Sequence, residues 1–195
     1  SILAVSLLAL VACTPEKKQE ADYSQYVNPM IGTDFTGNTY PGAQVPFGMV
    51  QLSPDNGLPG WDRISGYFYP DTTIAGFSHT HLSGTGAGDL YDISFMPVTR
   101  PYKEAPAPLG IYSTFSHNDE AASAGYYRVL LKDYNINVEL TATERCGIQR
   151  YTFPEAEASV FLNLKKAMNW DFTLDSKIEV VDSTTIRGYR LSQGW

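Results

Sequence analysis

The chain has 195 residues, of which 43% are hydrophobic and 18% are charged, a composition typical of a folded protein with one sizeable core. Its formal net charge is −7, and it lacks the clustered lysine and arginine that a phosphate-binding surface needs. Composition therefore excludes a disordered tail, and we expect no nucleic-acid partner.

Residues 1–12 read SILAVSLLALVA, an apolar run that is too short to span a bilayer and has the length of a signal-peptide core. Cys13 follows within the sequence LVAC, which resembles the bacterial lipobox, and the polar stretch after it is typical of a tether. We predict that residues 1–22 are a lipoprotein signal peptide and tether, with Cys13 as the lipidation site. The alternative is a buried N-terminal helix.

The lipobox implies an extracytoplasmic, membrane-anchored lipoprotein in the periplasm or on the cell surface of a Gram-negative bacterium, which touches the membrane through its lipid anchor only. A lipidated Cys13 leaves Cys146 without a cysteine partner, so we expect no disulfide. Because Cys146 lies in a strand-like run, we expect a small buried apolar residue and not a reactive thiol.

From Tyr23 onward, short β-branched and aromatic segments alternate with Pro, Gly, Asn and Asp, and helical periodicity is nearly absent. The clearest predicted strands lie in residues 123–136, 137–153 (one or two strands), 159–166 and 177–191 (a hairpin around Asp182 and Ser183). Alternating apolar and polar positions give these strands one dry and one wet face. We predict an all-β fold, an antiparallel β-sandwich over residues 23–195. Because the chain stops directly after the predicted hairpin, we expect this sandwich to be truncated.

Residues 26–100 have a different composition, with many Gly, Pro, Asn and aromatic residues and few long apolar segments. Long loops of this kind usually serve binding. Aromatic rings cover the C–H face of a pyranose while polar side chains reach its hydroxyl groups. The composition therefore favours a sugar-binding surface.

Trp61, Asp62 and Arg63 supply an indole for stacking, a carboxylate for hydroxyl groups and a planar guanidinium with five donors. We predict that all three bind substrate. The alternatives are that Trp61 caps the core and that Asp62 and Arg63 form a surface ion pair.

Residues 76–89 read GFSHTHLSGTGAGD. His79 and His81 are two positions apart, so on a strand both rings would point the same way. Gly84, followed by Gly86 and Gly88, allows positive φ or a close approach of the backbone to a ligand.

We predict substrate contacts from His79, His81 and Gly84. Two alternatives stay open for the histidines: structural residues held by hydrogen bonds, or a zinc site with Asp89 or Asp92 as third ligand.

Four motifs are similar, in this order, to the N-terminal domain of glycoside hydrolase family 92, the bacterial exo-acting α-mannosidases: NPMIGTD (28–34), YPGAQVPFGMVQLSPD (40–55), SGYFYPDTTIAGFSHTHLSGTGAGD (65–89) and FMPV (95–98). The likeness runs from about Tyr23 to Trp195. It implies a two-domain enzyme in which a β-sandwich precedes a catalytic (α/α)6 barrel, and in which calcium is required and α-mannosides of glycans are hydrolysed with inversion.

The resemblance places the general acid and base in the barrel, which is absent from this sequence. We therefore expect no catalytic residue in this chain, which alone should be inactive and should pair with its own C-terminal barrel. The resemblance also implies that the predicted binding residues line one wall of the mannose subsites.

Asp34, Asp55 and Asp89 are possible oxygen ligands for calcium, but no D-x-D-x-D-G loop is present, so the calcium ligands are expected outside this chain. Two alternatives from other classes remain: a non-catalytic carbohydrate-binding lipoprotein, and a purely structural sandwich whose glycine-rich loops serve domain packing.

Overall fold

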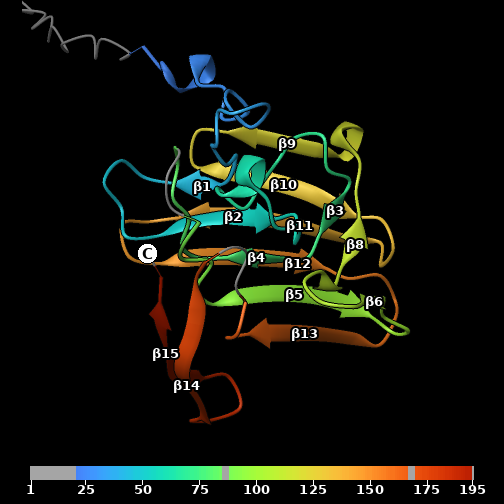
Figure 1. The fold of residues 1–195 in the computed structure, drawn as a ribbon. Helices are drawn as coiled ribbons and strands as arrows, with labels where there is room; N and C mark the ends of the chain where they lie inside the picture. Colours follow the sequence, from blue (N-terminus) through green and yellow to red (C-terminus); the bar gives the residue numbers. More distant parts are fainter. Residues whose placement is uncertain (1–20, 85–87, 167–169, 195) are drawn as a thin grey trace, which may run out of the picture.

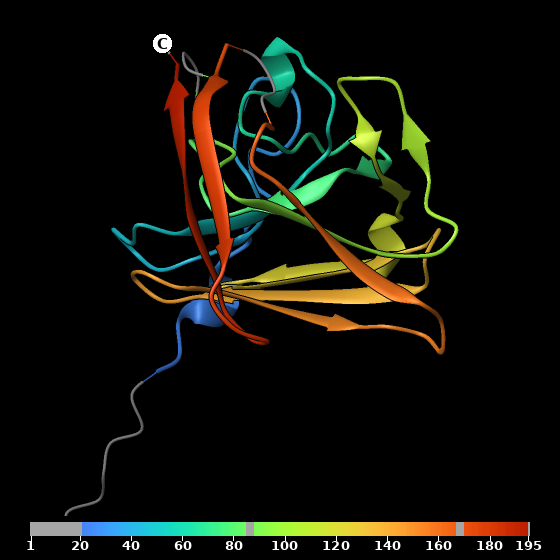
Figure 2. The same ribbon diagram turned by 90° about the horizontal axis from the view of Figure 1, so that it is seen from below.

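A computed structural model describes residues 21–84, 88–166 and 170–194. Cys13 and almost all of the predicted signal peptide and tether lie outside the described residues, as does Gly86. The described chain consists of antiparallel strands and three short 3-10 helices, and its two main sheets stack face to face (Figures 1 and 2). The predicted antiparallel β-sandwich is confirmed.

The larger sheet contains, in spatial order, β1 (Ala43–Gln44), β2 (Gln51–Asp55), β4 (Gly76–Ser78), β5 (Ser94–Thr99) and β13 (Ala158–Asn163). The facing sheet contains β12 (Gly147–Thr152), β11 (Ile136–Ala142), β10 (Tyr126–Leu131) and β9 (Glu120–Ser123). Four strands of the larger sheet, β1, β2, β4 and β5, come from residues 26–100, the region whose composition predicts long loops.

The remaining elements are small pairs and single turns. The strand pairs are β3 (Thr73–Ile74) with β8 (Ser113–Thr114), β6 (Glu104–Ala105) with β7 (Gly110–Ile111), and β14 (Phe172–Val180) with β15 (Ile186–Gln193). The 3-10 helices are η1 (Ser24–Tyr26), η2 (Trp61–Arg63) and η3 (His117–Asp119). None of the helices in the described ranges has the length and apolar character to span a bilayer.

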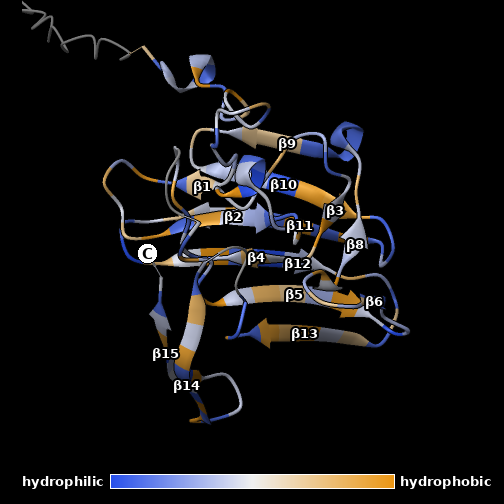
Figure 3. Ribbon diagram, viewed as in Figure 1, coloured by the Kyte–Doolittle hydropathy of each residue, from blue (hydrophilic) through white to orange (hydrophobic). Residues whose placement is uncertain are grey.

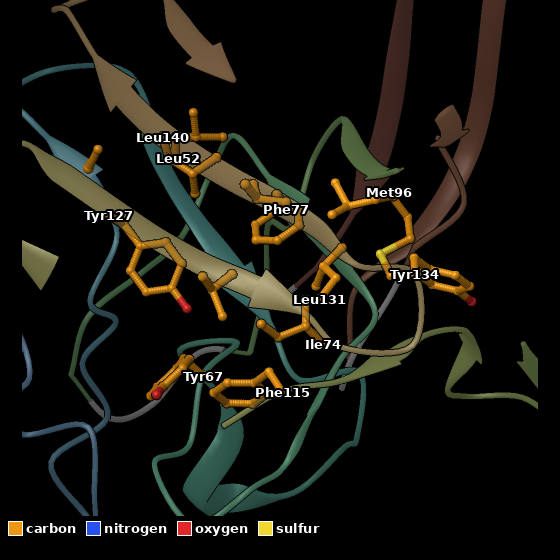
Figure 4. Close-up of a cluster of buried hydrophobic side chains, with 14 of the residues drawn as sticks. Leu52, Tyr67, Ile74, Phe77, Met96, Phe115, Tyr127, Leu131, Tyr134 and Leu140 are labelled. Atoms are coloured by element: carbon orange, nitrogen blue, oxygen red, sulfur yellow. The ribbon is translucent and has the colours of Figure 1, made fainter. Parts of the chain in front are cut away.

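The core lies between the two main sheets and follows from the alternation of side chains along each strand. In β10 and β11 every second residue is buried, and these inward positions carry Tyr127, Val129 and Leu131 from β10. Phe77 of β4 and Leu52 of β2 meet them from the larger sheet (Figure 4). Full burial of an aliphatic or phenyl side chain contributes about 1.5–3 kcal/mol, so this layer supplies much of the stability.

The hairpin β14–β15 extends away from the two stacked sheets (Figures 1 and 2). Hydrophobic residues recur along β14 (Figure 3), and half-exposed or exposed apolar side chains lie on both strands, among them Leu174, Val180, Ile186 and Leu191. A two-stranded hairpin is at best marginally stable on its own. It therefore depends on contacts at its base and presents apolar surface to whatever packs on it.

Cys146 lies in the turn between β11 and β12 and is exposed, so the expectation of a buried residue is wrong. The strand-like sequence is interrupted there because the amide of Thr143 donates a hydrogen bond to the carbonyl of Cys146, 2.8 Å away, which closes a tight turn.

Candidate functional site

The segment after β4 is held inside the sandwich by a buried group of charged side chains, here called the Asp55 cluster: Asp55, Ser78, His81 and Lys166. The side chains of Asp55 and His81 have no exposed surface, and that of Lys166 is 8% exposed. Asp55 Oδ1 accepts hydrogen bonds from Ser78 Oγ at 3.0 Å and His81 Nε2 at 2.9 Å. The Lys166 ammonium lies 3.2 Å from Asp55 Oδ2, an ion-pair distance, although the geometry there is not that of a good hydrogen bond.

Both ring nitrogens of His81 are engaged by buried protein atoms. Its Nδ1 lies 2.7 Å from the carbonyl oxygen of Gln51, and its Nε2 lies 2.9 Å from the Asp55 carboxylate and 3.2 Å from Ser78 Oγ. Neither nitrogen is left for a ligand, which favours the structural alternative for His81 over sugar contact.

Burial by itself would raise the pKa of Asp55, but the charges of Lys166 and His81 and the hydrogen bonds from His81 and Ser78 outweigh it and hold the pKa below its usual value of 3.8. The carboxylate therefore stays ionised at neutral pH. A buried carboxylate that is paired with the Lys166 ammonium and hydrogen-bonded to His81 and Ser78 is a structural element and not a proton donor.

His79 has a different environment from His81 because β4 ends at Ser78, so the rule that side chains two apart on a strand share a face does not apply. Its Nδ1 lies 2.9 Å from the carbonyl oxygen of Ile93, and its ring packs edge-on to Phe95. Burial lowers the pKa of His79. The ring is half-buried, and its binding role stays a prediction.

Gly84 is exposed, has a φ of +93° and has open space where a Cβ would stand. Its amide donates to the carbonyl of Asn38 at 2.7 Å, which fixes the loop to the N-terminal segment. The backbone at Gly84 is thus accessible, in keeping with the predicted close approach of a ligand, which stays a prediction.

Trp61, Asp62 and Arg63 form the 3-10 helix η2. Arg63 does not pair with Asp62: its guanidinium makes two hydrogen bonds to Asp71, at 2.6 and 2.5 Å, and lies over the ring of Phe68. The surface ion pair between Asp62 and Arg63 is therefore not formed. The hydrogen bonds from Arg63 to Asp71 hold the C-terminal end of η2 in place.

Trp61 is 53% exposed, so it does not cap the core. Its indole meets that of Trp170 edge-to-face, with ring centroids 6.2 Å apart and planes inclined by 70°. Trp170, which is 43% exposed, is not among the binding residues predicted from the sequence. The available signal was a tryptophan beside a charged residue and outside any apolar run, the same signal that selected Trp61.

A second buried ion network joins the glycine-rich segment to the C-terminal hairpin. The side chain of Arg190 on β15 is 1% exposed and contacts the carboxylates of Asp92 and Asp171. It also donates to the carbonyl oxygen of Lys166 at 3.1 Å and to Thr173 Oγ1 at 3.1 Å. Burial raises the pKa of Asp171, while the charge and hydrogen bond of Arg190 lower it.

The described residues do not fit a metal site. Among them, no group of three His, Cys, Asp or Glu side chains is placed to hold an ion. Asp55 is committed to Lys166 and His81, Asp92 to Arg190 and Thr80, and Asp34 accepts from the amide of Phe35. Neither the zinc alternative nor a calcium site finds support in this part of the molecule.

The described chain is thus an antiparallel β-sandwich that exposes two indoles near buried ion pairs. The profile of the Glycosyl hydrolase family 92 N-terminal domain matches residues 26–195, so the chain belongs to this family.

Similar solved structures belong to the same family. A family 92 α-mannosidase of Bacteroides thetaiotaomicron, BT3965, in complex with mannoimidazole, is 43% identical with a TM-score of 0.83 over 88% of this chain and 23% of its own. The inverting mannosidase BT2199 of the same organism is 30% identical with a TM-score of 0.65 over 84% of this chain and 21% of its own. An uncharacterized secreted glycosidase of Arthroderma benhamiae is 27% identical over 161 residues, 77% of this chain and 20% of its own length. The chain thus spans about a quarter or less of these relatives.

Proposed function

We propose that this chain is the N-terminal β-sandwich of an exo-acting α-mannosidase that hydrolyses α-mannosides of glycans with inversion. The observation that carries the proposal is the exposed indole of Trp61 on η2. It belongs to a domain that is 43% identical to an α-mannosidase solved in complex with mannoimidazole. Inversion in the proposal is supported by the description of BT2199 as an inverting mannosidase.

Inverting hydrolysis needs two carboxyl groups roughly 6.5–9.5 Å apart, one protonated to release the leaving group and one ionised to activate water. The buried aspartates of the described chain are committed to cations: Asp55 to Lys166, Asp71 to Arg63 and Asp171 to Arg190. The resemblance to family 92 assigns the acid and base to a C-terminal catalytic barrel, and we propose the same for this protein. The sandwich contributes substrate-binding loops and the interface to that barrel.

The hairpin β14–β15 supports the interface role, because its apolar side chains are exposed on both strands and it borders an apolar groove. This groove of about 410 Å³ lies between the hairpin and the outer part of the larger sheet, lined by Ile93, Phe95, Leu162, Leu164, Ile178 and Tyr189 among others. Exposed apolar surface of this kind marks a contact with other protein.

Calcium dependence is part of the proposal, with the ion held by residues outside this chain, since those described here do not fit it. We also propose an extracytoplasmic location with lipid attachment at Cys13, supported by the description of one relative as a secreted glycosidase.

The test uses the full-length protein and an α-mannoside substrate. Hydrolysis should release β-mannose first, as followed by NMR, and should be lost with a chelator and restored by calcium. Trp61→Ala should lower kcat/KM about tenfold because it removes a stacking surface worth about 1.4 kcal/mol. Phe47→Ala, at an exposed aromatic residue, is the matched control and should change nothing.

Unchanged kinetics in Trp61→Ala would remove Trp61 from the site. Mannose binding without any hydrolysis would instead indicate the non-catalytic carbohydrate-binding lipoprotein.

A further inference from the structure

Two exposed indoles from distant parts of the sequence pack edge-to-face on the surface. Trp61 comes from η2 and Trp170 from the segment before β14, and their planes meet at 70° with centroids 6.2 Å apart. In such an edge-to-face arrangement each ring keeps a face that its partner does not cover. The exposed fractions of 53% and 43% agree with this geometry.

The described residues on either side of Trp170 in the sequence, Lys166 and Asp171, are held by buried charges. The ammonium of Lys166 lies 3.2 Å from the carbonyl oxygen of Ala75 and 3.2 Å from Asp55. The carboxylate of Asp171, 1% exposed, contacts Arg190. Arg190 also donates a hydrogen bond to the carbonyl oxygen of Lys166, so one guanidinium contacts both residues.

Trp61 is supported in a similar way. Gly60, with a φ of +151°, turns the chain into η2, and the paired hydrogen bonds from Arg63 to Asp71 hold the end of the helix. Burying ion pairs costs desolvation energy, and a simple surface loop does not need them. Hydrogen bonds and ion pairs therefore hold residues beside both indoles, and a preorganised binding site requires such support.

We propose that Trp170 is a second aromatic wall of the mannoside site, so that Trp61 and Trp170 together hold one pyranose ring. A pyranose presents an apolar C–H face and a C–H edge, which two rings near a right angle contact at once. Asp62, partly exposed beside Trp61, offers a carboxylate to the hydroxyl groups. This inference rests on the proposed function and adds a positioning residue to it.

The experiment compares five variants of the full-length protein: Trp170→Ala, Trp170→Phe, Trp61→Ala, the double variant Trp61→Ala/Trp170→Ala and the control Phe47→Ala. Trp170→Ala should raise KM for an α-mannoside about tenfold with little change in kcat, since it removes binding surface and no reacting group. Trp170→Phe should recover most of the loss. The double variant Trp61→Ala/Trp170→Ala should lose less than the product of the single effects, because both rings contact the same sugar.

A second measurement does not depend on a variant that folds. N-bromosuccinimide oxidises accessible indoles, and mass spectrometry locates the modified residues. Both Trp61 and Trp170 should be oxidised in the wild-type protein and protected by saturating mannose.

Each remaining outcome decides against one of the two claims. If the wild type hydrolyses α-mannosides but Trp170→Ala keeps the KM of the wild type, Trp170 is not part of the site while the proposed function stands. The same holds if Trp170 resists oxidation without mannose, because the rest of the protein then covers it, or if mannose does not protect it. If the wild type hydrolyses no α-mannoside, the proposed function itself fails.

Discussion

Asp55→Asn tests whether the buried ion network holds the central strands together. The substitution preserves the shape of the side chain but removes the negative charge that Lys166 and His81 share. The Lys166 ammonium then stays inside the sandwich without its counter-ion. The change should destabilise the region where β2, β4 and Lys166 meet.

The expected size follows from burial. Asp55 and His81 have side chains with no exposed surface and Lys166 is 8% exposed, so removing the shared anion should cost about 3–5 kcal/mol. Glu179→Gln on the hairpin is the matched control, since Glu179 pairs with Arg187 at 2.9 Å but the two side chains are 44% and 69% exposed. An exposed pair contributes about 0–1 kcal/mol. The two variants should therefore differ by roughly 2 kcal/mol or more, a factor of about 30 in an equilibrium constant.

Amide hydrogen exchange on the full-length protein measures this difference locally, because it reports the opening free energy of each segment. Amides of β2 and β4, which pair through Ser53 and Ser78, should exchange much faster in Asp55→Asn and at the wild-type rate in Glu179→Gln. Opening free energies in Asp55→Asn within 1 kcal/mol of the wild type would refute the reasoning.

Two further predictions concern the same region. Because the folded-state pKa of Asp55 is held below 3.8, its charge stabilises the fold above that pH, and the contribution is lost as the pH falls through the lowered pKa. The difference in Tm between wild type and Asp55→Asn should therefore shrink as the pH falls below 3.8, and a difference that grows there would contradict the assignment. Gly66→Ala should lower Tm more than Gly84→Ala. Both glycines have φ near +90°, but a Cβ at Gly66 would stand 2.9 Å from Asp55 Oδ1 and His81 Cδ2, while a Cβ at Gly84 would meet no atom within 4 Å. Equal losses of Tm would show that backbone strain alone determines the effect.

The strands that the sequence predicts well are those with one wet face. β10, β11 and the hairpin β14–β15 alternate in the printed sequence, and their turns are marked by Asp, Asn and Ser. The central strands β2 and β4 are only 5 and 3 residues long and are buried nearly throughout, so no alternation is present to detect. β2 also contains Pro54, which argues against a strand when the sequence alone is considered.

The sequence predicts the exposure of Trp61 but not its contacts. Trp61 stands among Gly, Pro and charged residues, and its exposure follows from that composition. Lys166, the partner of Asp55, and Trp170, the partner of Trp61, come from the far end of the sequence. The pairing of β5 with β13 and the contact of Arg190 with Asp92 bring that end near β4. Local patterns carry no information on such contacts.

Two residues of the region around the glycine-rich segment are linked through side-chain contacts to the neighbours of Trp170. His81 contacts Asp55, which pairs with Lys166, while Asp92 contacts Arg190, which contacts Asp171 beside Trp170. Two chains of contacts thus run from His81 and Asp92 to Lys166 and Asp171. Substitutions in these chains should change KM and stability together, because they loosen the support of the indole. Substitutions of the exposed indoles Trp61 or Trp170 should change KM alone. The two patterns therefore distinguish residues that support the indoles from residues that contact the sugar.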